Sequence, residues 1–313
     1  MLKKILLPVL ALLCMAHAGC QYSSLLPGHK ITLNQARKLN LITKGNLNTV
    51  IVAPSNSTKI VQFGAEELQI FLQESFGVKV PVVETVQTGK VSIVLGDPSG
   101  KLVAPLPRDG FIIRSAGNVI TIAGRDDPKA DSKAALKGSL WGMLHERGTV
   151  FGVYDFLERF IGVRFYFPGE MGTVIPPHKD LQLPAMDIFE RPDYTVRYCN
   201  YSKGDLPDTS ISYNIQYYRL RLETEFIPCA HGLARMEYDK RFAATHPEYF
   251  ALLSNGQRLT GQLCFGSGIK DEIYKDAVAF LTGRPASERN LPCWDSSACI
   301  GSCICIMPND SVE

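Results

Sequence analysis

Apolar strands alternate with helices over residues 30 to 186, and this alternation restricts the possible folds more than any other feature of the chain. The β-branched run 49–53 predicts a strand, and residues 59–76 follow it with apolar side chains at helical spacing. Gly77 is placed to end that helix. The pattern continues with expected strands at 78–83, 91–95, 111–114 and 119–123, a helix at 148–160 and a stop at Gly162. Residues 30–186 are therefore predicted to form an α/β domain.

Residues 188 to 313 repeat the order of a strand followed by a helix. Strands are expected at 194–199, 225–229, 262–265 and 302–307, with helices between them, of which 270–282 is the clearest. Units of this kind after a separate α/β domain are typical of the first half of a (β/α)8 barrel. A full barrel takes about 250 residues, so we expect the chain to be a truncated product or a fragment. The alternative is a small, open α/β domain that is complete as it stands.

The first residues have the pattern of a signal peptide. Lys3 and Lys4 precede an apolar run over 5–15, and Ala16-His17-Ala18 then supplies the small residues that a signal peptidase accepts. The run is too short to cross a bilayer as a helix. We expect residues 1–19 to be removed and the protein to be exported. Two destinations remain open, because Ala18-Gly19-Cys20 also resembles a lipoprotein box: a free periplasmic or secreted protein, or one anchored to the cell envelope through lipid on Cys20.

Charge and cysteine usage narrow the partners. The formal net charge of +2 gives no electrostatic case for nucleic acid. The sequence contains no phosphate-binding loop, no nucleophile elbow and no His-Glu-x-x-His zinc motif, so we expect neither a metal nor another cofactor. Of the cysteines beyond Cys20, Cys293 and Cys299 are one possible disulfide in an exported protein. The other interpretation treats the cysteines as small, buried, apolar residues.

Four short stretches carry a resemblance to a known family. RGTVFGVYDFLERF at 147–160 and GVRFYFPG at 162–169 resemble the N-terminal domain of the family 67 alpha-glucuronidases and, more closely, the bacterial domain-of-unknown-function family 4838. HPEYFAL at 246–252 and PND at 308–310 are similar to the barrel portion of family 4838. The resemblance implies an alpha-glucuronidase N-terminal-like α/β sandwich followed by a barrel. The small residues Gly148 and Gly152 have a physical reason, since they let a helix lie close to a sheet.

Candidate site residues follow from the barrel expectation. Active sites of barrels gather at the carboxyl ends of the strands, and four such ends are expected, at Asn200, His231, Gly266-Ser267 and Asn309-Asp310. A glycosidase needs two carboxylates across the scissile bond. Asp310 is the candidate for one of them, either as a catalyst or as a sugar contact, and we expect the second beyond residue 313.

Other polar residues have competing interpretations. Arg197 and His231 could bind the carboxylate of a uronic acid, because a guanidinium matches a carboxylate in a bidentate manner. Arg197 could equally be a buried ion-pair partner within the structure. Asn200 and Asn309 are expected to contact the sugar. The run Arg125-Asp126-Asp127 is expected to be a solvated turn, and Glu248 to start a helix or to pack against one.

Together these features lead to one functional hypothesis and one alternative. The hypothesis is an exported carbohydrate-active protein, a glycoside hydrolase of alpha-glucuronidase-like architecture that acts on a polysaccharide and is catalytically incomplete over the residues given. The alternative is a non-catalytic carbohydrate-binding or surface-assembly protein on the same scaffold. Both have carbohydrate as the partner, and both contact a membrane only through a lipid on Cys20.

Overall fold

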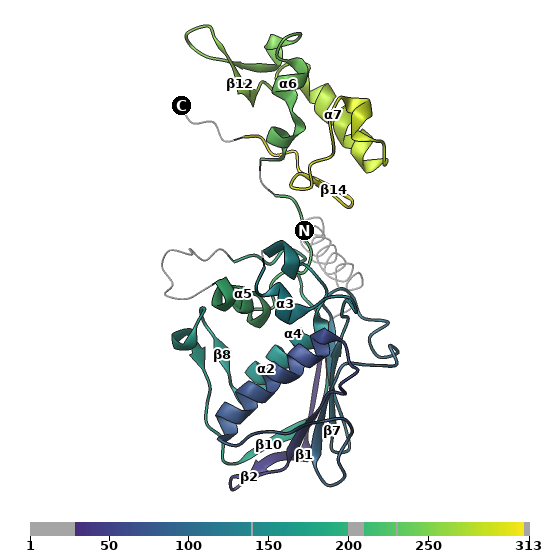
Figure 1. Cartoon of the computed structure of the whole chain (residues 1–313), viewed down its shortest axis with the longest axis vertical. Helices are drawn as coiled ribbons and strands as arrows, with labels where there is room; N and C mark the ends of the chain where they lie inside the picture. Colours follow the sequence, from purple (N-terminus) through teal and green to yellow (C-terminus); the bar gives the residue numbers. More distant parts are fainter. Residues whose placement is uncertain (1–28, 139, 200–209, 230, 310–313) are drawn as a thin grey trace, which may run out of the picture. The chain divides into compact units, whose positions relative to one another are not determined.

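The computed structural model describes residues 29–138, 140–199, 210–229 and 231–309. It contains two compact units, Met1–Glu225 and Phe226–Glu313 (Figure 1). The expected signal peptide at 1–19 and the lipidation candidate Cys20 lie outside the described residues. Within the described ranges, no helix combines the length and the apolar character needed to cross a membrane.

The first unit is built on a mixed eight-stranded sheet with the order β2-β1-β10-β6-β7-β5-β3-β4. In one half of the sheet, β4, β3, β5 and β7 pair with one another in parallel. In the other half, β1, β10 and β6 pair in antiparallel fashion, and β6 is also antiparallel to β7. The strands are β1 (Lys30–Thr43), β2 (Asn46–Leu47), β3 (Thr49–Val52), β4 (Val82–Val83), β5 (Val91–Leu95), β6 (Phe111–Ala116), β7 (Val119–Gly124) and β10 (Leu181–Glu190). The predicted α/β class is confirmed.

Helices α2 (Lys59–Phe76) and α4 (Gly148–Phe156) pack together and against the central strands of this sheet (Figure 1). Alternation along β6 assigns the two faces, since Ile113 belongs to the core under the helices and Ile112 belongs to a small cluster on the other face. Only a few apolar side chains cover that second face. The sandwich expected from the family resemblance is therefore not confirmed.

The bounds of α2 agree with the prediction because its caps are clear in the sequence. The Thr58 hydroxyl accepts a hydrogen bond from Val61 N at 3.3 Å, and Gly77 ends the helix in the left-handed region with φ 68°. The predicted helix at 148–160 is divided in two: α4 is followed by a π-helical turn, η2 (Leu157–Ile161), which Gly162 ends with φ 84°.

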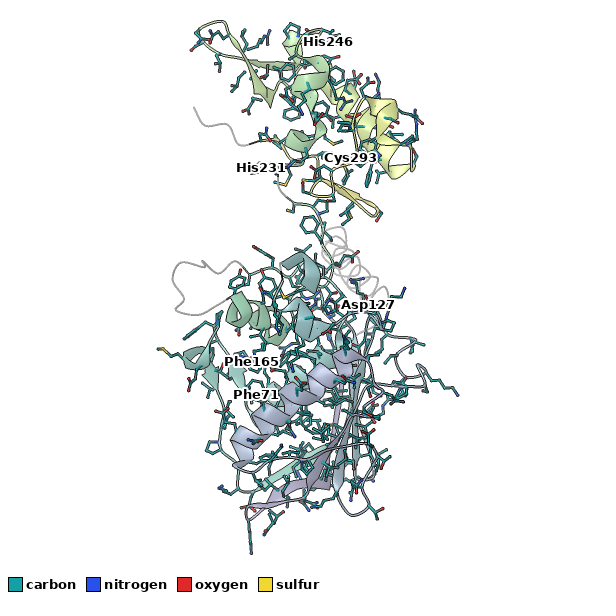
Figure 2. All side chains as sticks on the ribbon, in the orientation of Figure 1. Phe71, Asp127, Phe165, His231, His246 and Cys293 are labelled. Atoms are coloured by element: carbon teal, nitrogen blue, oxygen red, sulfur yellow. The ribbon has the colours of Figure 1, made fainter. Side chains whose placement is uncertain are left out.

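Aromatic side chains fill the core between the helices and the sheet. Phe71 of α2 meets Phe165 of the short strand β8 (Arg164–Phe165) edge to face, with ring centroids 5.2 Å apart (Figure 2). The same core contains Tyr213, Tyr217 and Tyr218 of helix α5 (Ser210–Arg219). Because α5 packs into this core, the structure divides its compact units after Glu225, later in the chain than the boundary near residue 187 expected from the sequence.

The start of α4 corrects one local prediction. The Asp126 carboxylate accepts a hydrogen bond from Thr149 N at 2.9 Å, so it satisfies a backbone donor of the first helical turn. The solvated turn expected at Arg125-Asp126-Asp127 is therefore wrong at Asp126. The sequence could not show this contact, because it joins residues 23 positions apart.

His145 lies next to this region and gives a pH prediction. Its imidazole is buried and bonded to Ser132 Oγ at 3.0 Å, and burial together with the Arg147 charge lowers the pKa of His145 to about 4. The unfolded chain takes up this proton near pH 6.5, whereas the folded chain resists it until about pH 4. Folding stability should therefore fall as the pH decreases through this window, by at most about 3 kcal/mol from this group.

Urea unfolding at pH 7 and pH 4.5 measures the effect. We expect His145→Gln to lose less stability between the two pH values than the wild type, because glutamine cannot take up the proton. Equal losses in both proteins would contradict the assignment.

The second unit is a smaller assembly of short elements around its own core. Helix α6 (Tyr238–Phe242) is joined to α7 (Ile269–Leu281) by a buried ion pair in which Arg241 contacts Asp276 through two bonds of 2.7 and 3.0 Å. The other elements are η5 (Gly232–Met236), η6 (Pro247–Tyr249), β11 (Phe250–Leu252), β12 (Arg258–Leu263), η7 (Ala286–Arg289), β13 (Cys299–Ile300) and β14 (Cys303–Ile304). The helix predicted at 270–282 is confirmed as α7.

The half barrel expected for residues 188–313 is not confirmed. The described segments 194–199 and 225–229 contain no strand. The expected strands at 262–265 and 302–307 contribute only β12 and β14, and each is antiparallel to its neighbour in the chain. Turns with φ 83° at Gly256 and φ 56° at Gly301 make these pairs hairpins, whereas parallel strands need crossovers of a dozen or more residues.

The cysteines that the structure describes are all free thiols. Cys293 is exposed, whereas Cys299 is buried, and the possible disulfide between them is not formed. Burial raises the pKa of the Cys299 thiol to about 11, which keeps it protonated and unreactive at neutral pH. Cys299 thus has the role of a small apolar core residue.

Candidate functional site

The second unit brings two of the expected site residues to one place. His231 Nδ1 lies 3.1 Å from the carbonyl oxygen of Pro308, the residue before Asn309. The backbone continues the contact, because Leu233 N donates to Met307 O at 3.2 Å. The chain segments around 231–234 and 307–309 therefore run against each other, although neither forms part of a barrel.

Backbone geometry fixes the short helix η5 at this place. His231 and Glu237, on either side of η5, both lie in the left-handed region with φ 43° and φ 50°. A non-glycine residue in such a conformation costs of order 1–3 kcal/mol and persists only where its surroundings hold it. A Cβ added to Gly232 would lie 2.0 Å from the carbonyl oxygen of Cys305, so the two backbones meet too closely for a side chain. The first residues of η5 are thereby held against residues 305–309.

A pocket of about 160 Å³ opens between these segments and strand β12. Its walls consist of Leu233, Ala234, Tyr238, Asp239, Thr260, Gly261, Gln262, Leu263, Pro308 and Asn309. The amide of Asn309 spans it, because Nδ2 donates to Gly261 O at 2.9 Å. The Oδ1 atom of Asn309 is buried and has no hydrogen-bond partner among the described residues.

An unsatisfied buried acceptor costs about 1–3 kcal/mol, so the Asn309 amide is arranged for a donor that the described protein does not supply. The nearby polar groups are uncharged apart from the exposed carboxylate of Asp239. Leu233 and Leu263 provide the apolar part of the wall. Such a site suits a small ligand with both hydroxyl groups and an apolar face.

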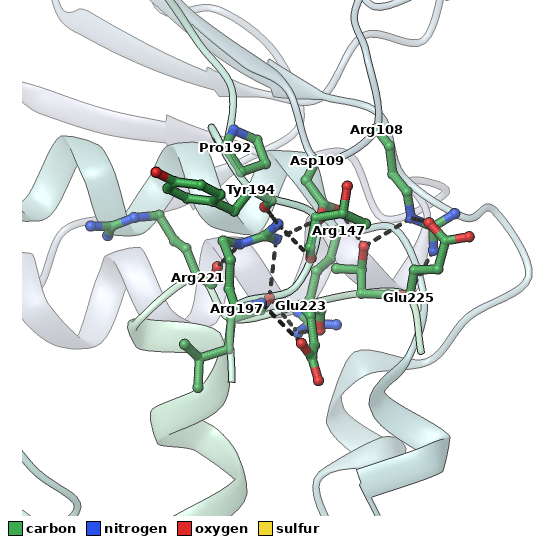
Figure 3. Close-up of polar contacts among 12 residues, drawn as sticks. Arg108, Asp109, Arg147, Pro192, Tyr194, Arg197, Arg221, Glu223 and Glu225 are labelled. Atoms are coloured by element: carbon green, nitrogen blue, oxygen red, sulfur yellow. Dashed lines mark hydrogen bonds and ion pairs between the residues drawn. The ribbon is translucent and has the colours of Figure 1, made fainter. Parts of the chain in front are cut away.

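Arg197 belongs to the first unit, where its guanidinium is fully occupied. Nη2 pairs with the buried carboxylate of Asp109 at 2.6 Å (Figure 3). The other N–H groups donate to carbonyl oxygens of the protein: Nε to Arg221 at 2.9 Å, Nη1 to Tyr194 at 2.6 Å and Thr195 at 3.2 Å, and Nη2 also to Leu222 at 3.4 Å. The buried ion pair that the sequence left open as the alternative for Arg197 is therefore present.

Near the end of the first unit, residues 221–224 form a segment that we call the connector. Three arginines, Arg108, Arg147 and Arg197, donate hydrogen bonds to its backbone carbonyls (Figure 3). Arg197 holds the first carbonyl of the connector, as described above. Arg147 Nη2 reaches the carbonyl oxygens of Leu222 and Glu223 at 3.5 and 3.3 Å. Arg108 Nη2 donates to Thr224 O at 2.6 Å. Each carbonyl of the connector thus has an arginine donor, which ties this strand-free segment to the first unit.

The remaining candidates divide between described and undescribed residues. Asn200 and the catalytic candidate Asp310 lie outside the described residues. Glu248 lies in the first turn of η6 and contacts His246 Nδ1 at 3.0 Å, as expected of a residue that starts a helix. In the described ranges no cluster of His, Cys, Asp and Glu could hold a metal ion.

Sequence reasoning missed the pocket residues on β12 and α6. Thr260, Gly261 and Gln262 lie in an exposed antiparallel strand, and Asp239 lies on a five-residue helix. No motif marks these positions, because the pocket depends on how the hairpin folds back toward Asn309. A polar run between turn residues was the only available signal.

Comparisons with known proteins gave one matching sequence family and only weak similarity to solved structures. No curated protein matches the chain. Among solved structures, the GH20 exo-β-N-acetylglucosaminidase of Vibrio harveyi is similar at 13% identity with a TM-score of 0.31, over 55% of this chain and 20% of that one. The GH20 β-N-acetylhexosaminidase of Streptomyces coelicolor gives 17% and 0.34, over 54% and 26%, and the β-N-acetylhexosaminidase of Bacteroides fragilis gives 18% and 0.28, over 54% and 24%. TM-scores this low do not establish a shared fold.

The chain therefore spans about a quarter or less of the length of these structures. The resemblance to the family 67 alpha-glucuronidases stays a prediction. Residues 167–288 match the family model described as "Domain of unknown function (DUF4838)", which confirms the resemblance to family 4838 over that range. The matched range includes η5, α6 and β12, and so most of the pocket at Asn309.

Proposed function

We propose that the chain is part of an exported carbohydrate-active protein and that the pocket at Asn309 holds one sugar unit of its polysaccharide. The observation that carries the proposal is the buried Oδ1 of Asn309, an acceptor without a partner among the described residues that line or surround the pocket. A sugar hydroxyl would supply the missing donor.

The wall of the pocket supports the same ligand class. Thr260 and Gln262 offer uncharged donors and acceptors that match hydroxyl groups, and Leu233 offers an apolar surface for the C–H face of a sugar ring. Because the Asp239 carboxylate is the single charge on the described lining, an anionic ligand would find no partner of opposite sign there.

The finer form of the proposal is a glycoside hydrolase of alpha-glucuronidase-like architecture, which needs two carboxylates across the bond that is cleaved. Asp239 is part of the lining, and Glu237 and Asp310 are each next in sequence to a lining residue. The observation that favours the non-catalytic alternative is the presence of only Asp239 on the described lining. Assays of the full-length protein on aryl glucuronides and decorated xylan separate the two: turnover that Asp310→Asn abolishes supports hydrolysis, and sugar binding without turnover supports the alternative.

Export is the second part of the proposal. The signal-peptide pattern of residues 1–19 supports it. The proposed ligand supports it as well, because a polysaccharide cannot enter the cytoplasm and its binding protein must meet it outside. Mass spectrometry of the mature N-terminus distinguishes the two destinations. A lipid on Cys20 means an anchored protein, and a free amine after Ala18 means a released one.

Asn309→Ala tests the pocket directly. We expect oligosaccharides from decorated xylan to bind the variant at least ten-fold more weakly than the wild type, which corresponds to about 1.4 kcal/mol, because the variant lacks the amide. Isothermal titration calorimetry measures the change. Asn118→Ala, which alters an exposed asparagine in the first unit, is the matched control and should leave affinity unchanged. Equal affinities of wild type and Asn309→Ala would remove the support for this pocket.

A further inference from the structure

The first unit contains a second pocket, of about 260 Å³, where the end of α4 meets the end of β10. Phe111, Phe151 and Leu220 form its apolar part. Its polar lining consists of Asp109, Asp155, Arg159, Glu190, Arg191, Arg197 and Arg221, with Pro192 beside them. None of the candidate functions discussed above uses this pocket as a binding site.

The charges of the lining are balanced in number, because its four arginines (Arg159, Arg191, Arg197 and Arg221) stand beside Asp109, Asp155, Glu190 and the neighbouring Glu158. Arg159 contacts Asp155 through two bonds of 2.9 and 3.0 Å and also reaches Glu190 at 3.0 Å. Arg221 pairs with Glu158, which lies just outside the lining, and Arg197 pairs with Asp109 as described above. A charged ligand would therefore leave an uncompensated charge in a partly buried site, which is costly.

Donors remain after these pairs are formed. Nη1 of Arg159 and Nε of Arg221 have no hydrogen-bond partner within the described part of the chain. The side chains of Arg159 and Arg221 are each 30% exposed, and both line the pocket. Each paired carboxylate oxygen also retains a lone pair that can accept a hydroxyl proton.

Unusual backbone holds these side chains in place. Arg159 belongs to the π-helical turn η2, a rare structure that is frequent at functional sites. Asp109 and Arg221 are non-glycine residues with φ 60° and φ 54°, and strained residues of this kind cluster where ligands bind. Three independent departures from regular backbone thus meet at one small pocket.

We propose that this pocket binds a single neutral sugar unit, a pentose or hexose without a carboxylate or sulfate. Its volume lies just below the range of about 300–1,000 Å³ that is usual for pockets of drug-sized ligands, so one small ring is the largest occupant that fits. Balanced charges select a neutral ligand, the remaining donors and lone pairs match hydroxyl groups, and Leu220 offers an apolar surface to the ring. The site lies wholly in the first unit and does not depend on the pocket at Asn309.

Ligand-observed NMR with methyl glycosides of glucose, galactose, mannose and xylose tests the proposal on the whole chain. At least one of them should bind the wild type, and its affinity should fall at least ten-fold in Arg159→Lys, which keeps the charge but loses the planar donor. Leu220→Trp, which fills the pocket, should reduce binding in the same way. Arg37→Lys, at an exposed arginine elsewhere in this unit, is the control and should bind as the wild type does.

Two further comparisons keep this site separate from the other one. Asn309→Ala should retain the part of the binding that Arg159→Lys removes, so the two pockets can fail independently. Glucuronic acid should bind at least ten-fold more weakly than the best neutral glycoside. The proposal is overturned if no neutral glycoside shows binding that is sensitive to both Arg159→Lys and Leu220→Trp in folded variants, or if glucuronic acid binds more tightly than all of them.

Discussion

Gly124→Ala is expected to unfold the first unit or to destabilise it by more than about 4 kcal/mol, the range reserved for severe steric conflicts. A Cβ at Gly124, the last residue of β7, would lie 2.2 Å from the carbonyl carbon of Gly148 and 2.6 Å from Thr149 N. These atoms are backbone, so they cannot move aside as a flexible side chain can. Helix α4 begins at Gly148, and the strand and helix therefore approach so closely that only glycine fits.

Gly64→Ala is the matched control for this prediction. Gly64 lies inside α2, and an added Cβ would meet Val153 and Val150 at 3.6 and 3.7 Å, which are ordinary contacts. Alanine should therefore stabilise the helix by up to about 1 kcal/mol. Urea unfolding followed by circular dichroism measures both variants. A Gly124→Ala protein as stable as the wild type would show that the contact between β7 and α4 is not as close as described.

Arg147→Met should destabilise the chain by about 3–5 kcal/mol, because it leaves several buried carbonyls without a donor. Arg147 is fully buried, and its guanidinium lies 4.2 Å from the centroid of the Tyr218 ring and 5.1 Å from that of Phe151. It donates to the carbonyl oxygens of Met143, His145, Leu222 and Glu223. Methionine keeps much of the volume and provides none of these bonds.

The same arginine shows how its charge is tolerated without a direct carboxylate partner. Burial lowers the pKa of Arg147 to about 10, so it remains protonated at neutral pH, and carbonyl oxygens and aromatic faces replace water around it. Arg37→Met, at an exposed arginine, should change stability by no more than about 0.5 kcal/mol. Hydrogen exchange of the connector adds a second readout: faster exchange at 221–224 in Arg147→Met is expected, and unchanged exchange would contradict the role of Arg147 in holding it.

The elements that could be predicted from sequence are those with local signals. Helix α2 has a threonine cap and a terminal glycine, and the β6–β7 hairpin has a turn at Gly117-Asn118 between two β-branched runs. The resemblance at 147–169 also indicated correctly that glycine is needed where α4 meets the sheet. Each of these signals involves residues only a few positions apart, so it can be recognised from the sequence alone.

The long strands β1 and β10 were not predicted because their pairing is not local. Strand β1 pairs with β10, with Leu39 opposite Leu183, and most of β1 is exposed and polar, so its apolar periodicity is weak. The error in the second part has the opposite cause. Apolar runs at 225–229 and 302–307 suited buried parallel strands, but short runs of this kind do not distinguish a parallel strand from a hairpin or an extended segment.

The candidate site could be predicted only in part for the same reason. His231 and Asn309 were each expected at a strand end of a barrel, and the structure brings them together without a barrel, through the contact of His231 with the carbonyl of Pro308. Arg197 has its donors satisfied by Asp109 and by backbone carbonyls of residues 194–195 and of the connector, a set of contacts that no sequence pattern records. The pocket lining on β12 depends on a hairpin that folds back from a turn at Gly256. The sequence indicates this turn but not which residues the returning strand contacts.

A crystal structure of the chain soaked with an oligosaccharide from decorated xylan tests the central claim most directly. We predict one sugar ring in the pocket formed by η5, β12 and residues 308–309, with a hydroxyl group within hydrogen-bond distance of Asn309 Oδ1. A structure at saturating sugar in which this pocket contains no sugar, or in which Asn309 Oδ1 is bonded to another group of the protein, would contradict the proposal.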